Sequence, residues 1–205
     1  MARDTQSITK MSRREGYALH PKAIKHMVKR STVPGQHGRT GRRSNPSQYA
    51  LQLREKQKVK RLYGLLERQF SNLMKEASRR TGQSGTILLQ LLEQRADNVA
   101  YRAGFANSRR AARQLVTHGH FMLNGRRVDI PSIRLKPGDV LTVRPKSTTT
   151  EYFKHLDDIT SQNDVVVSWI NVDRKKLTVT VTGIPPREEA EPEINEQLIV
   201  EYYSR

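Results

Sequence analysis

Hydrophobic positions recur with helical spacing through the first half of the chain, from Tyr49 onward. Between residues 59 and 77 they recur at offsets of three, four and seven residues, which places them on one face of a helix. These positions are Val59, Leu62, Tyr63, Leu66, Phe70, Leu73, Met74 and Ala77. Gly64 interrupts the stripe and marks either a bend or a break between two helices. After a stop signal at residues 81–85, a further helical face comprises Ile87, Leu88, Leu91 and Leu92.

The next stretch combines short helices with a hairpin. Residues 98–116 predict two short helices separated by residues 104–107. Ser108 suits the N-cap of the second helix, and Gly119 suits its C-terminal stop. Asn124-Gly125 lies between two short strand-like runs and predicts a type I′ hairpin. The remaining pattern predicts a turn at residues 136–139, a strand over 140–143 and a short helix over 151–159. It also predicts a hairpin of strands over 165–172 and 177–181. The last segment, over 194–203, fits either helix or strand.

Residues 1–46 follow neither pattern. They are basic, and their later half is rich in glycine, serine and proline, so little apolar surface offsets the entropy of ordering. We expect an extended, irregular segment that becomes ordered on a partner. The alternative is a disordered tail.

Charge narrows the choice of partner. The formal net charge is +17 and the sequence pI is about 10.5. Residues 1–62 carry +13 and residues 93–146 carry +7, whereas residues 147–205 carry −5. Such an excess favours a polyanion, because each neutralised phosphate releases condensed counterions. A membrane surface is the competing polyanion, but no apolar run approaches the roughly 20 residues of a membrane span. The chain has no cysteine, which excludes disulfides and thiolate metal sites and fits an intracellular protein.

Basic residues around the second short helix are the best candidates for binding chemistry. The helix N-terminus at Ser108 offers backbone N–H groups to an anion, and arginine matches phosphate oxygens bidentately. The candidate RNA-binding residues along the chain are Arg13, Arg14, His37, Arg39, Arg42, Arg43, Arg54, Lys56, Lys58, Lys60, Arg61, Ser108, Arg109, Arg110, Arg113, His118, His120, Asn124, Arg126 and Arg127. Because aromatic residues are few, we expect recognition of shape and backbone rather than base stacking.

Catalytic and metal sites find little support. Asp157 with Asp158, and Glu188 with Glu189, are adjacent in sequence and are typical of solvated charges. There is no nucleophile elbow and no phosphate-binding glycine loop. The spacing of the histidines, including His20, His26 and His37, matches no compact ligand motif. We therefore expect no enzyme activity, no cofactor and no metal.

Several ordered motifs lie along the chain: Pro34–Gly38, Leu51–Val59, Tyr63-Gly64, Leu66–Phe70, Leu89–Glu93, Asp97–Val99, Tyr101-Arg102, Gly104-Phe105, Ala112–Val116 and Ile194–Glu201. Together they resemble the bacterial small-subunit ribosomal protein S-four family. The resemblance covers nearly the whole chain. It implies a structural, primary binder of small-subunit ribosomal RNA (rRNA) that nucleates assembly of the subunit body, in the cytoplasm or an organelle and away from membranes.

The resemblance also implies the fold and the partners. The expected fold is α+β, with a basic extension over residues 1–45, a helical domain over 46–92 completed by 185–205, an inserted S-four RNA-binding domain (alpha-L motif) with a small antiparallel sheet over 93–157, and a β-hairpin over 158–184. Ribosomal proteins S-five and S-three are the implied protein neighbours, near the pore through which messenger RNA (mRNA) enters. By position, Arg39, Arg42 and Arg43 are candidates to contact mRNA. The acidic C-terminal region is a candidate to supply the S-five contact, which is associated with decoding accuracy.

One departure concerns the N-terminus. Some members of the family bind zinc there through four cysteines, whereas this chain has Thr9 and Ser12 where the first two would lie. RNA contacts and packing are then expected to hold this region.

Two other classes of protein use a similar RNA-binding unit. A pseudouridine synthase needs a large catalytic domain and an aspartate motif that Arg95-Ala96-Asp97 does not match. A small stress-related RNA chaperone would not need the flanking ribosomal motifs, so the flanks favour the ribosomal protein.

Overall fold

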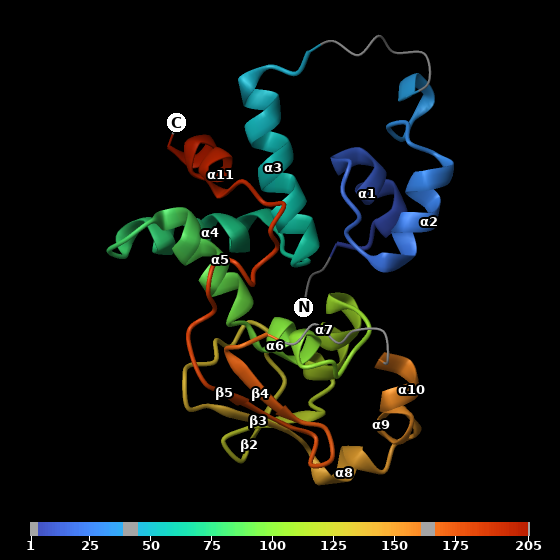
Figure 1. The fold of residues 1–205 in the computed structure, drawn as a ribbon, viewed down its shortest axis with the longest axis vertical. Coiled ribbons are helices and arrows are strands. Elements are labelled where there is room, and N and C mark those ends of the chain that lie inside the picture. The colour runs from blue at the N-terminus through green and yellow to red at the C-terminus, as the bar shows by residue number, and fades with distance from the viewer. Residues whose placement is uncertain (1–3, 39–44, 161–166, 205) are drawn as a thin grey trace. The chain divides into compact units, whose positions relative to one another are not determined.

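The computed structural model describes residues 4–38, 45–160 and 167–204. Two compact units make up the chain (Figure 1). Unit 1 combines residues 1–88 with residues 193–205, and unit 2 comprises residues 89–192. Unit 1 is therefore built from the two ends of the chain, whereas unit 2 is one continuous segment.

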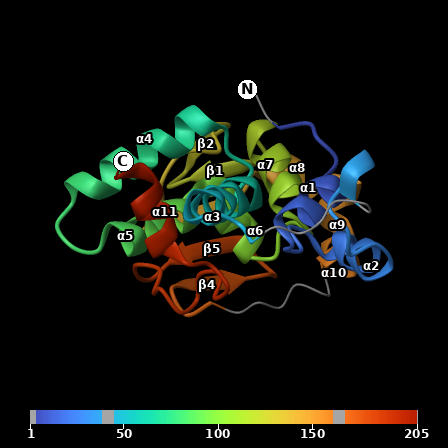
Figure 2. The same ribbon diagram turned by 90° about the horizontal axis from the view of Figure 1, so that it is seen from above.

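Unit 1 is helical. Its elements are α1 (Ile8–Glu15), α2 (Pro21–Lys29), the 3-10 turn η1 (Gln36–Gly38), α3 (Gln48–Leu62), α4 (Glu67–Arg79), the start of α5 (Ser84–Glu93) and α11 (Glu196–Tyr203). The helix α11 packs against α3 (Figures 1 and 2), and α1 packs against α2 and α3. The predicted stripe over residues 59–77 is divided between α3 and α4, with Gly64 at φ +66° in the break. No helix in the described part of the chain is long and apolar enough to cross a membrane.

The prediction of an irregular N-terminal segment was wrong for α1 and α2. Met11 and Ala23 are buried, so a few apolar positions suffice to seat the two helices. Ser12 fixes the turn after α1: its buried Oγ donates to the Ile8 carbonyl (2.8 Å) and accepts from the Leu19 N–H (3.2 Å). The composition of the whole segment hides these local signals. Ser12 therefore orders this turn through its own hydrogen bonds.

The C-terminal segment, which the sequence left undecided, is the helix α11. The Asn195 side chain caps it by accepting a hydrogen bond from the Gln197 N–H. Ile199 is fully buried, and Gln52 of α3 donates to Glu201 (2.9 Å). The last residues of the chain thus complete the core that its first half begins.

Unit 2 packs short helices against one antiparallel sheet. The helices are α6 (Ala96–Arg102), α7 (Arg109–Thr117), α8 (Pro145–Thr148), α9 (Glu151–Lys154) and α10 (Leu156–Thr160), and the strands are β1 (Phe121–Leu123), β2 (Arg126–Val128), β3 (Val140–Val143), β4 (Ile170–Asp173) and β5 (Thr178–Val181). The strand order is β2-β1-β3-β5-β4. Phe121, Leu141 and Val179 pack in one core with Ala112 and Val116 of α7.

Three expectations for unit 2 change in detail. The predicted helix over residues 151–159 is two short helices, α9 and α10, which meet at His155. The predicted strand over 165–172 begins only at Ile170 within the described residues, because residues 167–169 form a loop and 165–166 lie outside them. The second hairpin does not form a separate sheet, since β5 pairs with β3.

The first hairpin has the turn that the sequence predicts. Asn124 and Gly125 both have positive φ, +49° and +81°, as a type I′ turn requires. The Asn124 side chain also joins this turn to β3, because its Oδ1 accepts from the Val140 N–H (2.9 Å) and its Nδ2 donates to Asp139 (2.8 Å). The turn between Lys136 and Asp139 is likewise present.

Candidate nucleic-acid interface

The N-cap of α7 is as predicted. Ser108 has an extended backbone, and its side chain accepts a hydrogen bond from the Ala111 N–H (3.2 Å). Ala112 and Val116 face the core, which fixes the direction of the neighbouring arginines. The three arginines of α7 nevertheless have different surroundings.

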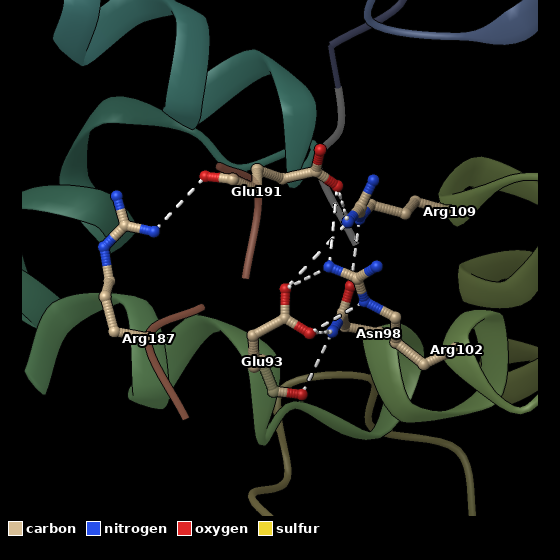
Figure 3. Close-up of polar contacts among 6 residues, drawn as sticks. All are labelled: Glu93, Asn98, Arg102, Arg109, Arg187 and Glu191. Atoms are coloured by element: carbon tan, nitrogen blue, oxygen red, sulfur yellow. Dashed lines mark hydrogen bonds and ion pairs between the residues drawn. The ribbon is translucent and has the colours of Figure 1, made fainter. Parts of the chain in front are cut away.

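Arg109 is held inside the protein (Figure 3). Its side chain is 13% exposed. The guanidinium donates to Asn98 (2.9 Å) and to Glu191 (2.8 Å), and lies 4.6 Å from the centre of the Tyr101 ring. This arrangement satisfies a charge that the sequence suggests for RNA. Arg109 is therefore chiefly a structural residue in this structure.

Glu93, at the end of α5, is the centre of the same network (Figure 3). Its side chain is only 1% exposed. Arg102 donates to both of its carboxylate oxygens (3.0 and 2.9 Å), and Asn98 donates to one of them (2.7 Å). Arg102 also lies 3.5 Å from Glu191, whose backbone carbonyl accepts from Arg187 (3.5 Å). The network ties α5, α6 and α7 to the segment that follows the sheet.

Sequence reasoning missed the function of these residues. Asn98 and Arg102 are four residues apart, so they share one face of α6, and that signal was available. Their partners Glu93 and Glu191 are almost a hundred residues apart in sequence, and no local pattern links them. Long-range ion pairs of this kind become visible only in the fold.

Arg113 also has an internal partner. It lies 3.5 Å from Asp97, which Arg95 holds bidentately (3.0 and 2.8 Å). The side chain of Arg110 is exposed. The structure therefore does not bring the three arginines of α7 together as one open phosphate-binding face.

The cations of α3 are likewise engaged within unit 1. Arg54 and Arg61 pair with Glu15, Lys56 and Lys60 pair with Glu67, and Lys58 pairs with Glu55 and donates to the Glu193 carbonyl. Lys56 is only 3% exposed. Burial opposes ionisation of Glu67, but hydrogen bonds from Lys56, Lys60 and Tyr203 outweigh it and lower its pKa to about 2. These ion pairs join α3 to α1 through Glu15 and to α4 through Glu67.

The N-terminal candidates are only partly described. Arg13 donates to the Thr32 carbonyl (2.7 Å), and Arg14 is exposed. His37 lies in the turn η1. Arg39, Arg42 and Arg43 fall outside the described residues, so the expectation of mRNA contact stays a prediction.

The last group of candidates surrounds the β1–β2 hairpin. Arg126 and Arg127 are exposed, and His118 and His120 lie at the end of α7 and the start of β1, with ring centres 6.1 Å apart. Asn124 is used by the turn. In the described part of the chain, neither arginine forms an ion pair with a carboxylate. The same holds for Arg144 and Lys146, two cations near the end of β3 that the sequence analysis left out.

Comparisons with known proteins also divide the chain into two parts, with a boundary between residues 93 and 94. The family model described as "Ribosomal protein S4/S9 N-terminal domain" matches residues 3–93, and the S4 domain matches residues 94–141. The small ribosomal subunit protein uS4 of Chloroflexus aurantiacus is 51% identical over 206 residues, and that of Chlorobium phaeovibrioides is 50% identical over 206 residues. The uS4 protein of Clostridioides difficile is 48% identical over 211 residues. Each alignment covers 100% of both chains. This chain therefore belongs to the uS4 family of ribosomal proteins.

Proposed function

We propose that this protein is a structural constituent of the small ribosomal subunit, not an enzyme, and that it binds the rRNA of that subunit. Full-length similarity to proteins named for the small subunit supports the ribosomal role. The presence of an S4 domain and the net charge of +17 support an RNA partner.

One observation supports the RNA surface most directly: the structure separates two kinds of cation. The cations of α3, together with Arg95, Arg102, Arg109 and Arg113, pair with carboxylates. The exposed arginines of the β1–β2 hairpin have no such partner among the described residues. A cation without an internal partner is available to neutralise a phosphate and release counterions. RNA contact therefore belongs to the hairpin side of unit 2 more than to the N-terminus of α7.

Binding to a transcript of small-subunit rRNA tests this proposal. At matched salt, the protein should bind this transcript more tightly than a large-subunit rRNA transcript of equal length. Arg126→Gln should weaken binding and reduce the slope of log affinity against log salt by about one. Lys154→Gln, which removes an exposed cation paired with Glu151, should change affinity much less. Equal affinity for both transcripts would contradict a specific role on the small subunit.

The finer roles are also proposals. Nucleation of the subunit body fits an RNA binder with charge on both units. Contact with mRNA at the pore where it enters would come from Arg39, Arg42 and Arg43. The acidic C-terminal region, with a net charge of −5 over residues 147–205, is the candidate to contact ribosomal protein S-five, and S-three would be a second neighbour. Replacing Arg39, Arg42 and Arg43 by alanine should reduce crosslinking of mRNA to this protein in reconstituted subunits, while rRNA binding persists.

A further inference from the structure

The strand register places two basic side chains opposite each other, His120 just before β1 and Arg144 just after β3. Phe121 pairs with Val143 of β3 and with Val128 of β2, and all three side chains are buried. Side chains alternate between faces along a strand, so Met122 and Thr142, the next residues within β1 and β3, point to the other face of the sheet. His120 and Arg144 are opposite each other, and the Arg144 N–H donates to the His120 carbonyl (2.8 Å).

The end of α7 brings further donors to the same corner. Gly119 has φ +71°, and a Cβ placed there would lie 2.6 Å from Nε of Arg127. The Arg127 side chain therefore passes directly over Gly119. We call His118, His120, Arg127 and Arg144 the corner cluster.

Arg144, a member of the corner cluster, has a hydrogen-bond donor that no described residue satisfies. Its Nε is buried and has no hydrogen-bond partner among the described residues. It also forms no ion pair with a carboxylate in that part of the chain, unlike Arg95, Arg102 or Arg113. Buried donors in folded proteins are nearly always satisfied, and an anion satisfies an arginine best.

We propose that the corner cluster is the binding site for one backbone phosphate of RNA, with Arg144 as its main ligand. This site rests on the proposed function, because the phosphate comes from the RNA that the protein binds. It differs from the predicted site at the N-terminus of α7, where the arginines already have partners.

Phosphate binding at this site is linked to proton uptake. Burial, His118 and Arg144 together lower the pKa of His120 below its ordinary value of 6.5. The other groups that contact His120 are the Ser147 hydroxyl (3.0 Å from Nδ1) and the Phe153 ring, and the guanidinium of Arg127 lies over the adjacent Gly119. A bound phosphate offsets the repulsion from the neighbouring cations and raises the pKa of His120. Affinity for RNA should therefore rise as the pH falls through the range in which His120 gains its proton.

Binding of a small-subunit rRNA transcript by the full chain tests the site. Arg144→Gln should lower affinity roughly tenfold and reduce the salt slope by about one. Lys175→Gln is the matched control, because Lys175 is an exposed cation in the β4–β5 turn, on the opposite edge of the sheet. His120→Gln should reduce the gain in affinity between about pH 8 and about pH 5.5. Thermal melting checks that each variant is folded, and Arg127→Gln tests the same site if Arg144→Gln is not.

The outcomes separate the two proposals. If the wild-type protein binds the transcript and the corner variants behave like Lys175→Gln, the phosphate site is overturned and the rRNA-binding role stands. If the wild-type protein does not bind the transcript, the proposed function itself fails. If His120→Gln keeps the pH dependence of the wild type, the link to proton uptake is overturned.

Discussion

At the scale of single residues, the arginines of this chain have two roles that the sequence alone does not distinguish: some pair with carboxylates inside the fold, and others are exposed and available to RNA. Glu93 and Glu191 form ion pairs with Arg102 and Arg109, and Asp97 forms ion pairs with Arg95 and Arg113. Burying a charge without a partner is costly, so these arginines and carboxylates depend on one another. The acidic residues of a strongly basic chain are accordingly as important for its fold as the basic ones.

Glu93→Gln should strongly destabilise the protein. It removes the carboxylate that accepts both hydrogen bonds from the buried guanidinium of Arg102 and leaves it the longer contact with Glu191, and breaking a buried pair of this kind costs about 3–5 kcal/mol. Glu151→Gln is the control, because Glu151 is exposed and, among the described residues, pairs with the exposed side chains of Lys154 and His155. That change should stay within about 0.5 kcal/mol. Urea unfolding followed by circular dichroism measures both, and equal midpoints would show that the network contributes little.

At the scale of elements, Glu67 joins three helices. It accepts from Lys56 and Lys60 of α3, and from the Tyr203 hydroxyl of α11 (2.9 Å), at the first position of α4. Lys56 also lies 4.6 Å from the centre of the Tyr202 ring. One carboxylate thus links α4 to both helices of the α3–α11 pair.

The pKa of Glu67 predicts an acid-sensitive unit 1. Its folded value of about 2 lies below the ordinary 4.5, so the carboxylate stabilises the fold above pH 4.5. That contribution is lost as the pH falls from 4.5 through about 2. The melting temperature of Glu67→Gln should therefore be lower than that of the wild type at pH 7, and the difference should shrink towards pH 2. A constant difference across this range would contradict the prediction.

The turn between β1 and β2 is a second test at this scale. Asn124→Ala removes the hydrogen bond that the Val140 N–H donates and places alanine at φ +49°. Each effect costs on the order of 1 kcal/mol. The amide of Val140 should exchange with deuterium faster than in the wild type, whereas amides of β5 should change less. Asn124→Gly relieves the backbone strain and should recover part of the loss.

At the scale of the whole molecule, unit 1 depends on both ends of the chain. Ile199 is buried, and Asn195 and Glu193 make hydrogen bonds to side chains of α3. Deleting residues 193–205 should therefore expose α3 and α4 to hydrogen exchange while β1, β3 and β5 stay protected. Equal loss of protection in both units would show that they unfold together.

How far the sequence predicts this molecule depends on how local each signal is. The α3 stripe, the Ser108 cap and the Asn124-Gly125 turn depend on neighbouring residues, and the structure confirms them. The helices α1 and α2 were missed because only a few apolar residues, such as Met11 and Ala23, seat them. The partners of Arg109 and Lys56 could not be predicted, because they come from distant parts of the chain. No pattern in the sequence indicates that Nε of Arg144 lacks a hydrogen-bond partner among the described residues.

The discontinuous make-up of unit 1 has a consequence for synthesis. Domains generally begin to fold while the chain is still growing from its N-terminus. Here unit 2 is complete once residue 192 has been made, whereas α3 still lacks the helix that covers it. Unit 1, whose first residues are synthesised earliest, therefore completes its folding last. A product truncated before α11 would leave α3 uncovered.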